Sequence, residues 1–211
     1  MMRTIGSPKY RVPNIIFGLY EPPIYGVSWD GGENPTLTRT NSSQGMVATA
    51  GVDSQVVRND FDYAQIYSEI KDYTDSYGNE FVVIPKCYIK KTAIGNARTW
   101  QISKRRIDGA YLPACFWDFE HNRELPYVLI GKYNANLSDD GTKLESKSGK
   151  WPLVNKNIVQ FRDYAQANGV GYQQLDGVIV DLLQTLFYIE FATLDSQSIM
   201  RGWANGRWNS A

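Results

Sequence analysis

The sequence has no excess of charge of either sign, and this absence narrows the choice of partner. Its 211 residues include 22 Lys and Arg and 22 Asp and Glu, so the formal net charge is zero. A nucleic-acid-binding surface needs Lys and Arg to neutralise phosphates, and an anionic membrane surface attracts polybasic amphipathic segments. We therefore expect neither nucleic acid nor a membrane among the partners.

Histidine and cysteine, which are common ligands of transition metals, are almost absent. His121 is the only histidine, and Cys87 and Cys115 are the only cysteines. Their spacing matches no zinc pattern, so we predict no metal and no other cofactor. The two cysteines can pair in a disulfide, but we favour two buried free thiols.

Motifs of catalysis and secretion are missing too. The chain contains no G-x-S-x-G, no P-loop and no G-x-G-x-x-G. Its first residues, MMRTIGSPKYRVPN, lack the apolar core of a signal peptide, which predicts folding in a cytoplasm. We therefore expect a non-enzymatic protein without catalytic residues.

Aromatic residues and turn formers are plentiful. The sequence holds 14 Tyr and 6 Trp, which suit both cores and recognition surfaces, together with 18 Gly and nine Pro. This composition favours a loop-rich domain with short strands. Residues 1–13 are expected to form an N-terminal arm, and residues 14–211 a single domain.

One apolar run near the end of the sequence, LDGVIVDLLQTLFYIEF at residues 175–191, is the strongest predicted element. Its apolar residues recur at steps of three and four, which is the period of an α-helix. The run is shorter than the roughly 20 apolar residues of a membrane span, and Asp181, Gln184 and Glu190 interrupt it. We predict a buried core helix that begins at Asp176 as its N-cap. A buried Glu190 would need a hydrogen-bond donor, from an Arg or from backbone amides.

Shorter elements are predicted from period and turn residues. The expected strands are 24–30 and 36–40, joined as a hairpin, then 81–89 with Pro85 at an edge or bulge, 99–103, and a buried strand at 127–133. The expected helices are 61–73 and 157–168, the second ended by Gly169.

Two clusters of acidic residues each have a structural interpretation as a turn and a chemical interpretation as a site. Asp139 and Asp140 precede a glycine and are typical of a solvated turn, with catalysis or calcium binding as the alternative. For Asp30, Glu33 and Asn34 around 31–32, a hairpin turn is favoured over calcium binding.

A Cys–His pair is the one candidate for nucleophilic catalysis. It would join His121 to Cys115 or Cys87, but a core thiol and an exposed loop histidine are the favoured interpretation. The basic cluster 104–106, Lys-Arg-Arg, suggests either a solvated loop or a contact to an acidic partner or sugar phosphate.

The last residues, RGWANGRWNSA, hold the predicted binding residues. Trp and Arg are common in recognition surfaces, and Asn adds adaptable hydrogen bonds. The candidates are Trp203, Asn205, Arg207, Trp208 and Asn209. Alternatively, both tryptophans complete the core of this domain or of a neighbouring subunit.

Several stretches resemble C-type-lectin-fold proteins of bacteriophage and prophage tails and fibres. These phage and prophage proteins are similar in turn to variable proteins of diversity-generating retroelements and to the formylglycine-generating-enzyme superfamily. The pieces are YGVSWD (25–30), LTR (37–39), IPKCYIKK (84–91), LPACF (112–116), VLIGKYNAN (128–136), LESKSGKWPLVN (144–155), FRDYAQANGVGYQQLD (161–176) and LLQTLFYIEFATLDSQS (182–198).

The resemblance implies an α+β fold in which two helices pack on a small, loop-rich antiparallel sheet. It also implies a virion protein, in a tail, fibre or baseplate, assembled in the host cytoplasm as a homotrimer. Other virion proteins and a host-surface glycan or protein are the implied partners, and host-receptor binding or tail assembly is the implied role.

The sequence departs from the family at its end. The family continues beyond the two helices with Arg-Gly-x-Glu-Asn and Gly-Asn-x-Trp-Glu-Trp type patterns, whereas this sequence stops at WNSA. It is therefore either a shortened relative or part of a longer sequence. Two alternative functions remain: a purely structural virion component, and an oxidase of the formylglycine-generating type that binds copper or calcium.

Overall fold

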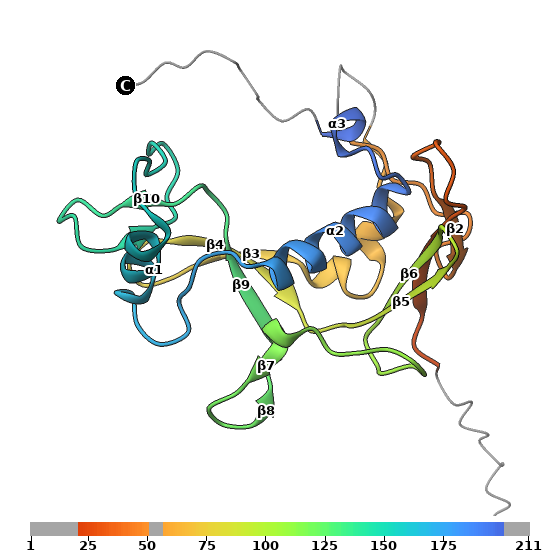
Figure 1. The fold of residues 1–211 in the computed structure, drawn as a ribbon, viewed down its shortest axis with the longest axis horizontal. Helices are drawn as coiled ribbons and strands as arrows, with labels where there is room; N and C mark the ends of the chain where they lie inside the picture. The colour runs from red at the N-terminus through yellow and green to blue at the C-terminus, as the bar shows by residue number, and fades with distance from the viewer. Residues whose placement is uncertain (1–20, 51–56, 201–211) are drawn as a thin grey trace, which may run out of the picture.

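The computed structural model describes residues 21–50 and 57–200, which form two antiparallel sheets around the long helix α2 (Figure 1). The predicted arm 1–13 lies outside these ranges. The four-stranded sheet has the order β2-β1-β6-β5, and the three-stranded sheet has the order β3-β4-β9. The α+β class is thus confirmed for the described residues.

The bounds of the elements follow the chain. The strands of the two larger sheets are β1 (Ile24–Trp29), β2 (Thr38–Asn41), β3 (Lys71–Thr74), β4 (Glu80–Pro85), β5 (Tyr88–Ile94), β6 (Ala97–Ser103) and β9 (Tyr127–Gly131). Two small hairpins pair β7 (Trp117–Asp118) with β8 (Arg123–Glu124) and β10 (Asn136–Leu137) with β11 (Leu144–Glu145). The α-helices are α1 (Ile158–Gln166), α2 (Gly177–Phe191) and α3 (Ser196–Ile199), and the 3-10 turns are η1 (Asp60–Tyr63), η2 (Tyr67–Glu69) and η3 (Ala114–Phe116).

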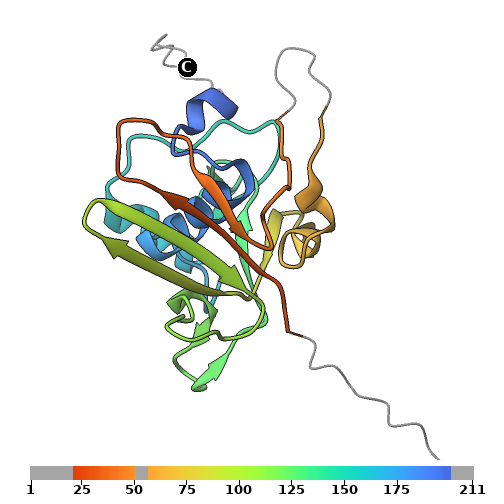
Figure 2. The same cartoon turned by 90° about the vertical axis from the view of Figure 1, so that its right-hand side faces the viewer.

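One face of the four-stranded sheet covers α2, which lies behind the sheet in Figure 2. Alternation along the strands places successive side chains on opposite faces, so cross-strand partners share a face. The rows Val27–Trp100–Lys91 and Tyr25–Ile102–Ile89 lie on the helix side. Trp100 contacts Tyr188 of α2 at 5.2 Å between ring centroids, and Lys91 forms an ion pair with Asp181.

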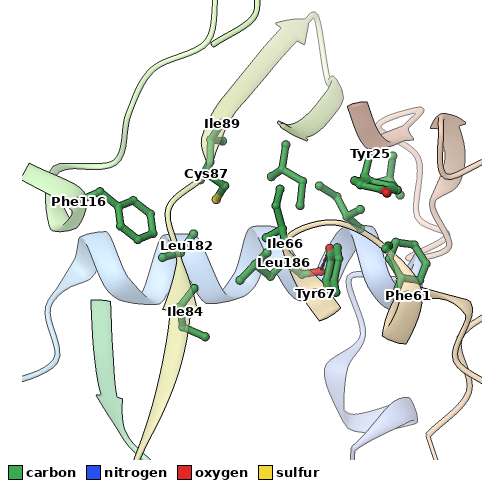
Figure 3. Packing of buried hydrophobic residues seen from close by; sticks show 14 of the residues in the cluster. Tyr25, Phe61, Ile66, Tyr67, Ile84, Cys87, Ile89, Phe116, Leu182 and Leu186 are labelled. Atoms are coloured by element: carbon green, nitrogen blue, oxygen red, sulfur yellow. Dashed lines mark hydrogen bonds between the residues drawn. The ribbon is translucent and has the colours of Figure 1, made fainter. Parts of the chain in front are cut away.

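The helix α2 confirms the predicted core helix. The Asp176 side chain accepts a hydrogen bond from the Ile179 amide at 2.9 Å, so Asp176 is the N-cap. Ile179, Leu182, Leu186 and Ile189 are buried, and the last three join residues of both sheets in a single apolar cluster (Figure 3). The helix is not buried all round, because Val178 and Val180 are exposed on the other side.

The C-terminal turn of α2 is held by side chains from distant elements. The Arg39 guanidinium donates to the carbonyls of Ile189 and Glu190, which lie in the last turn and have no donor further along the helix. The same guanidinium lies 4.9 Å from the centroid of the Phe61 ring. The Tyr67 hydroxyl donates to the Leu186 carbonyl at 2.9 Å. The elements β2, η1 and η2 therefore meet at the C-terminal end of α2.

The predicted strand 81–89 is two strands in different sheets. β4 ends at Pro85, which lacks an amide hydrogen, and β5 starts at Tyr88. Between them the Lys86 amide donates to the Pro126 carbonyl, and Cys87 is buried. A single apolar run in the sequence thus crosses from one sheet to the other, which local pattern does not reveal.

The predicted helix 61–73 is wrong. This stretch forms the two 3-10 turns η1 and η2 and then strand β3. Ile66 has a φ of +78°, which interrupts any helix, and Tyr63 is 91% exposed although the pattern placed it on the apolar face. Burial of Phe61, Ile66 and Tyr67 in the core overrides the helical period.

Two further expectations need correction. The helix 157–168 exists as α1, capped by Asn157 and Gln160, but it contacts β11 rather than the sheet that covers α2. The picture of two helices packed on one small sheet therefore does not describe this arrangement. The strand predicted as buried at 127–133 is β9, which ends at Gly131. It alternates in exposure because Val128 and Ile130 pack against the core while the alternate residues face solvent.

The contacts of Arg39 predict a large loss of stability when its guanidinium is removed. Arg39→Met leaves two carbonyls of the last helical turn without donors, so we expect the free energy of unfolding to fall by about 2–4 kcal/mol. Urea denaturation followed by circular dichroism measures it. The control is Arg58→Met, which removes an exposed ion pair with Asp60 and should change stability by less than about 1 kcal/mol. Equal losses for both variants would contradict the role of Arg39.

Burial of Glu190 predicts a pH dependence of stability. Burial raises the pKa of this carboxyl above its ordinary value of 4.5, although Asn59 donates to it at 2.7 Å. The folded state then holds the proton at a higher pH than the unfolded state, so this group lowers stability as pH rises from about 4.5 through the folded pKa. We expect Glu190→Gln, which keeps an acceptor for Asn59, to gain stability relative to wild type as pH rises, measured by thermal melts between about pH 4 and pH 8. A constant difference across this range would contradict the prediction.

Candidate functional site

The binding residues predicted in the tail cannot be placed. Trp203, Asn205, Arg207, Trp208 and Asn209 all lie outside the described residues, so that prediction stays a prediction. The other candidate clusters are described.

The acidic clusters are turns that bind their own backbone. Asp140 accepts hydrogen bonds from the Ser138 and Thr142 hydroxyls at 2.7 Å each, and these bonds lower its pKa to about 2. Asp30 and Asn34 likewise accept from amides two residues further on, both at 2.9 Å. These contacts agree with the favoured turn interpretation, and residues 21–50 and 57–200 contain no group of three His, Cys, Asp or Glu that could hold a metal ion.

The cysteines are free, as favoured from the sequence, although Cys115 is only half-buried. Burial raises the pKa of the Cys87 thiol to about 12 and that of Cys115 to about 11, so both are protonated at neutral pH. His121 lies in the β7–β8 loop, where its Nδ1 is 2.8 Å from the Asp118 carboxylate. Its ring therefore faces a carboxylate in a turn.

An open groove of about 410 Å³ lies beside the β7–β8 hairpin, which projects from the rest of the molecule in Figure 1. Its volume falls within the range of small-ligand sites. Its polar and aromatic walls are Tyr88, Arg106, Tyr111, Trp117, Phe119 and Glu124. We call these six residues the aromatic groove.

Backbone pairing and core packing fix one wall of the aromatic groove. Tyr111 and Ile89 exchange two backbone hydrogen bonds of 2.9 Å, which ties the segment before η3 to the edge of β5. The Tyr111 hydroxyl reaches Asp181 of α2 at 3.5 Å, and partial burial followed by this carboxylate raises its pKa. Phe116 is fully buried and points toward α2, near Leu182 (Figure 3).

The hairpin β7–β8 carries the other wall. Trp117 follows the buried Phe116 and lies opposite Glu124 in the hairpin, so adjacent aromatic residues point to the core and to the groove. Phe119 is 77% exposed at the loop. Asp118 closes the loop by accepting from the His121 amide at 3.2 Å and from Arg123 Nε at 3.1 Å. Desolvation raises the pKa of Asp118, but these bonds outweigh it and the pKa lies below its ordinary value.

The carboxylate of the aromatic groove is paired with a lysine outside the groove, whereas the guanidinium of the groove has no ion pair among the described residues. Glu124 pairs with Lys86 at 2.7 Å and accepts from the Tyr88 hydroxyl at 3.0 Å, and these bonds lower the pKa of Glu124. Burial and the same bond raise the pKa of Tyr88. Arg106 is exposed and forms no hydrogen bond or ion pair with any residue that the structure describes. The groove therefore retains one positive charge with free donors.

The structure divides the basic cluster that the sequence singled out. Lys104 forms an ion pair with Glu69 and Arg105 is an exposed neighbour outside the groove, whereas Arg106 lines it. Among the groove residues, the sequence singled out Arg106 as part of a candidate cluster, but it did not point to Tyr88 and Glu124. No local signal could join them, because they meet only through the pairing of β5, β6, β7 and β8.

Comparisons with family models, with curated proteins and with solved structures find no match for this chain. Among the helices that the structure describes, none has the length and apolar character needed to cross a membrane. The site must therefore be interpreted from its own geometry.

Phe116 is buried and Phe119 is exposed, which predicts a large loss of stability when the first ring is removed and almost no change when the second is removed. Phe116→Ala removes a fully buried ring, so we expect the free energy of unfolding to fall by about 3–5 kcal/mol. Phe119→Ala removes a ring that is mostly in solvent and should change it by no more than about 0.5 kcal/mol. Urea denaturation of the two variants tests this, and a large loss for Phe119→Ala would show that the ring packs within the fold.

Proposed function

We propose that the chain is a non-enzymatic virion protein with a C-type-lectin-like fold, located in a phage tail, fibre or baseplate. It acts in host-receptor binding or tail assembly, and it works as a homotrimer beside other virion proteins. The observation that carries the binding role is the aromatic groove, an open hollow walled by exposed aromatic rings and an unpaired arginine. This combination is suited to recognition and offers no activated nucleophile.

The way the resembling stretches meet in the fold supports the proposed family. Arg39 of the LTR piece binds the last turn of the helix formed by LLQTLFYIEF, and Phe116 of LPACF packs toward the same helix. Pieces separated by up to about 150 residues therefore form one core.

A surface near α1 supports assembly with sister subunits. Trp151 is 81% exposed, and Val154, Ile158 and Val159 are between 55% and 64% exposed within nine residues of the chain. Large apolar side chains gathered in this manner are typical of protein interfaces. This observation also favours the second candidate, a purely structural virion component.

The oxidase alternative finds less support. A thiolate is the form that binds copper or attacks a substrate, and both thiols have pKa values of about 11 to 12. Measurement of metal content in the purified protein remains the direct test, with stoichiometric copper or calcium as the result in favour of an oxidase.

Adsorption competition tests the proposed function. Particles from cells that carry the coding sequence are purified and searched for this chain by mass spectrometry, and purified chain is then added to host cells before the particles. We expect the chain in the particles and a concentration-dependent fall in adsorption. Phe119→Ala, which should fold normally, is expected to compete at least about 3-fold less well.

Each result decides between the candidates. Chain found in particles but without any effect on adsorption would identify the structural component. Absence of the chain from purified particles would overturn the virion proposal itself.

A further inference from the structure

We infer that the aromatic groove is a binding site for an acidic saccharide, with Arg106 as the residue that recognises its anionic group. The inference rests on the proposed function, because it names the chemical class of receptor that the groove would take. It draws on three features of the site: its free charge, its exposed ring faces and its open shape.

The charges in and beside the groove favour an anionic ligand. Glu124 is already neutralised by Lys86 at 2.7 Å and shares its oxygens with the Tyr88 hydroxyl. It therefore offers little to a cationic ligand. Arg106 forms no hydrogen bond or ion pair with any residue in 21–50 or 57–200, although its charge acts on nearby Glu124 and Tyr88. Its planar fork of donors matches a carboxylate or phosphate. An anion at this position gains charge-assisted hydrogen bonds without breaking an existing ion pair.

The exposed aromatic rings favour a saccharide as the uncharged part of the ligand. Phe119 is 77% exposed and Tyr111 is 42% exposed, while Trp117 is partly exposed between them in the chain. The negative face of an aromatic ring attracts the slightly positive C–H edge of a saccharide ring. The Tyr88 hydroxyl and the Glu124 carboxylate, which lie on the same groove, provide polar groups for sugar hydroxyls.

Other ligand classes fit less well. A nucleic acid would meet only one free cation in the groove, on a chain whose formal net charge is zero. A purely apolar ligand would desolvate Arg106 without giving it a hydrogen-bond partner. A saccharide that places one anionic group at Arg106 matches both the single charge and the polar rim.

Titration calorimetry with paired saccharides tests the inference. The probes are trigalacturonate and its methyl ester, which carry or lack carboxylates, and phosphorylated maltotriose and maltotriose, which carry or lack a phosphate. We expect the acidic member of at least one pair to bind with a Kd on the order of 1 mM and at least about 10-fold more tightly than its neutral partner. The pair that shows this preference identifies the anionic group.

Two neighbouring arginines provide the variant and its control. Arg106→Gln should abolish the preference for the acidic member, whereas Arg105→Gln removes the same charge outside the groove and should keep it. Both side chains are exposed, so both variants should melt as wild type does.

Three outcomes would overturn the inference: no binding of any probe, equal binding of acidic and neutral partners, or equal losses in the two arginine variants. Adsorption competition separates these failures from failure of the proposed function. If purified chain still blocks particle adsorption while no acidic saccharide binds, the receptor role stands and the ligand class is wrong.

Discussion

The last turn of α2 presents the carbonyls of Ile189 and Glu190, and the fold supplies their missing donors from Arg39, on a strand about 150 residues earlier in the chain. A buried carbonyl without a donor is costly, so this contact constrains more than the helix. It fixes the β1–β2 hairpin against the helix end, and the Leu37 amide continues the contact by donating to the Ala192 carbonyl at 2.8 Å. The β1–β2 hairpin and the last turn of α2 therefore stabilise each other.

The aromatic groove is a consequence of how the core is built around the other end of α2. Phe116, the last residue of η3, is buried near Leu182, whereas Trp117, which begins strand β7, lines the groove. The switch of the chain from β4 to β5 at Pro85 brings Tyr88 to the same place. Core packing and the lining of the aromatic groove are thus coupled through adjacent residues.

Much of the remaining structure is held by short polar contacts rather than by a large sheet. Asp140 closes the β10–β11 turn and Asp118 closes the β7–β8 loop, each by accepting several hydrogen bonds within a few residues. Such turns tolerate variation in the side chains that project from them. This gives a physical reason why a loop-rich domain can present an exposed ring such as Phe119 on a fixed base.

Local sequence determined those elements in which period and end signals agree. The helix α2 with its cap at Asp176 and the helix α1 with its cap at Asn157 follow from apolar spacing and capping residues, and the turns at Asp139–Asp140 follow from short polar side chains beside glycine. Tertiary structure decided the rest. Ile66 has a positive φ because its neighbours are buried in the core, and this breaks the helix that the pattern of 61–73 predicted. The meeting of Arg106, Glu124 and Trp117 required strand pairing between distant segments, which local pattern cannot encode because the energy of such contacts appears only when the chain is folded.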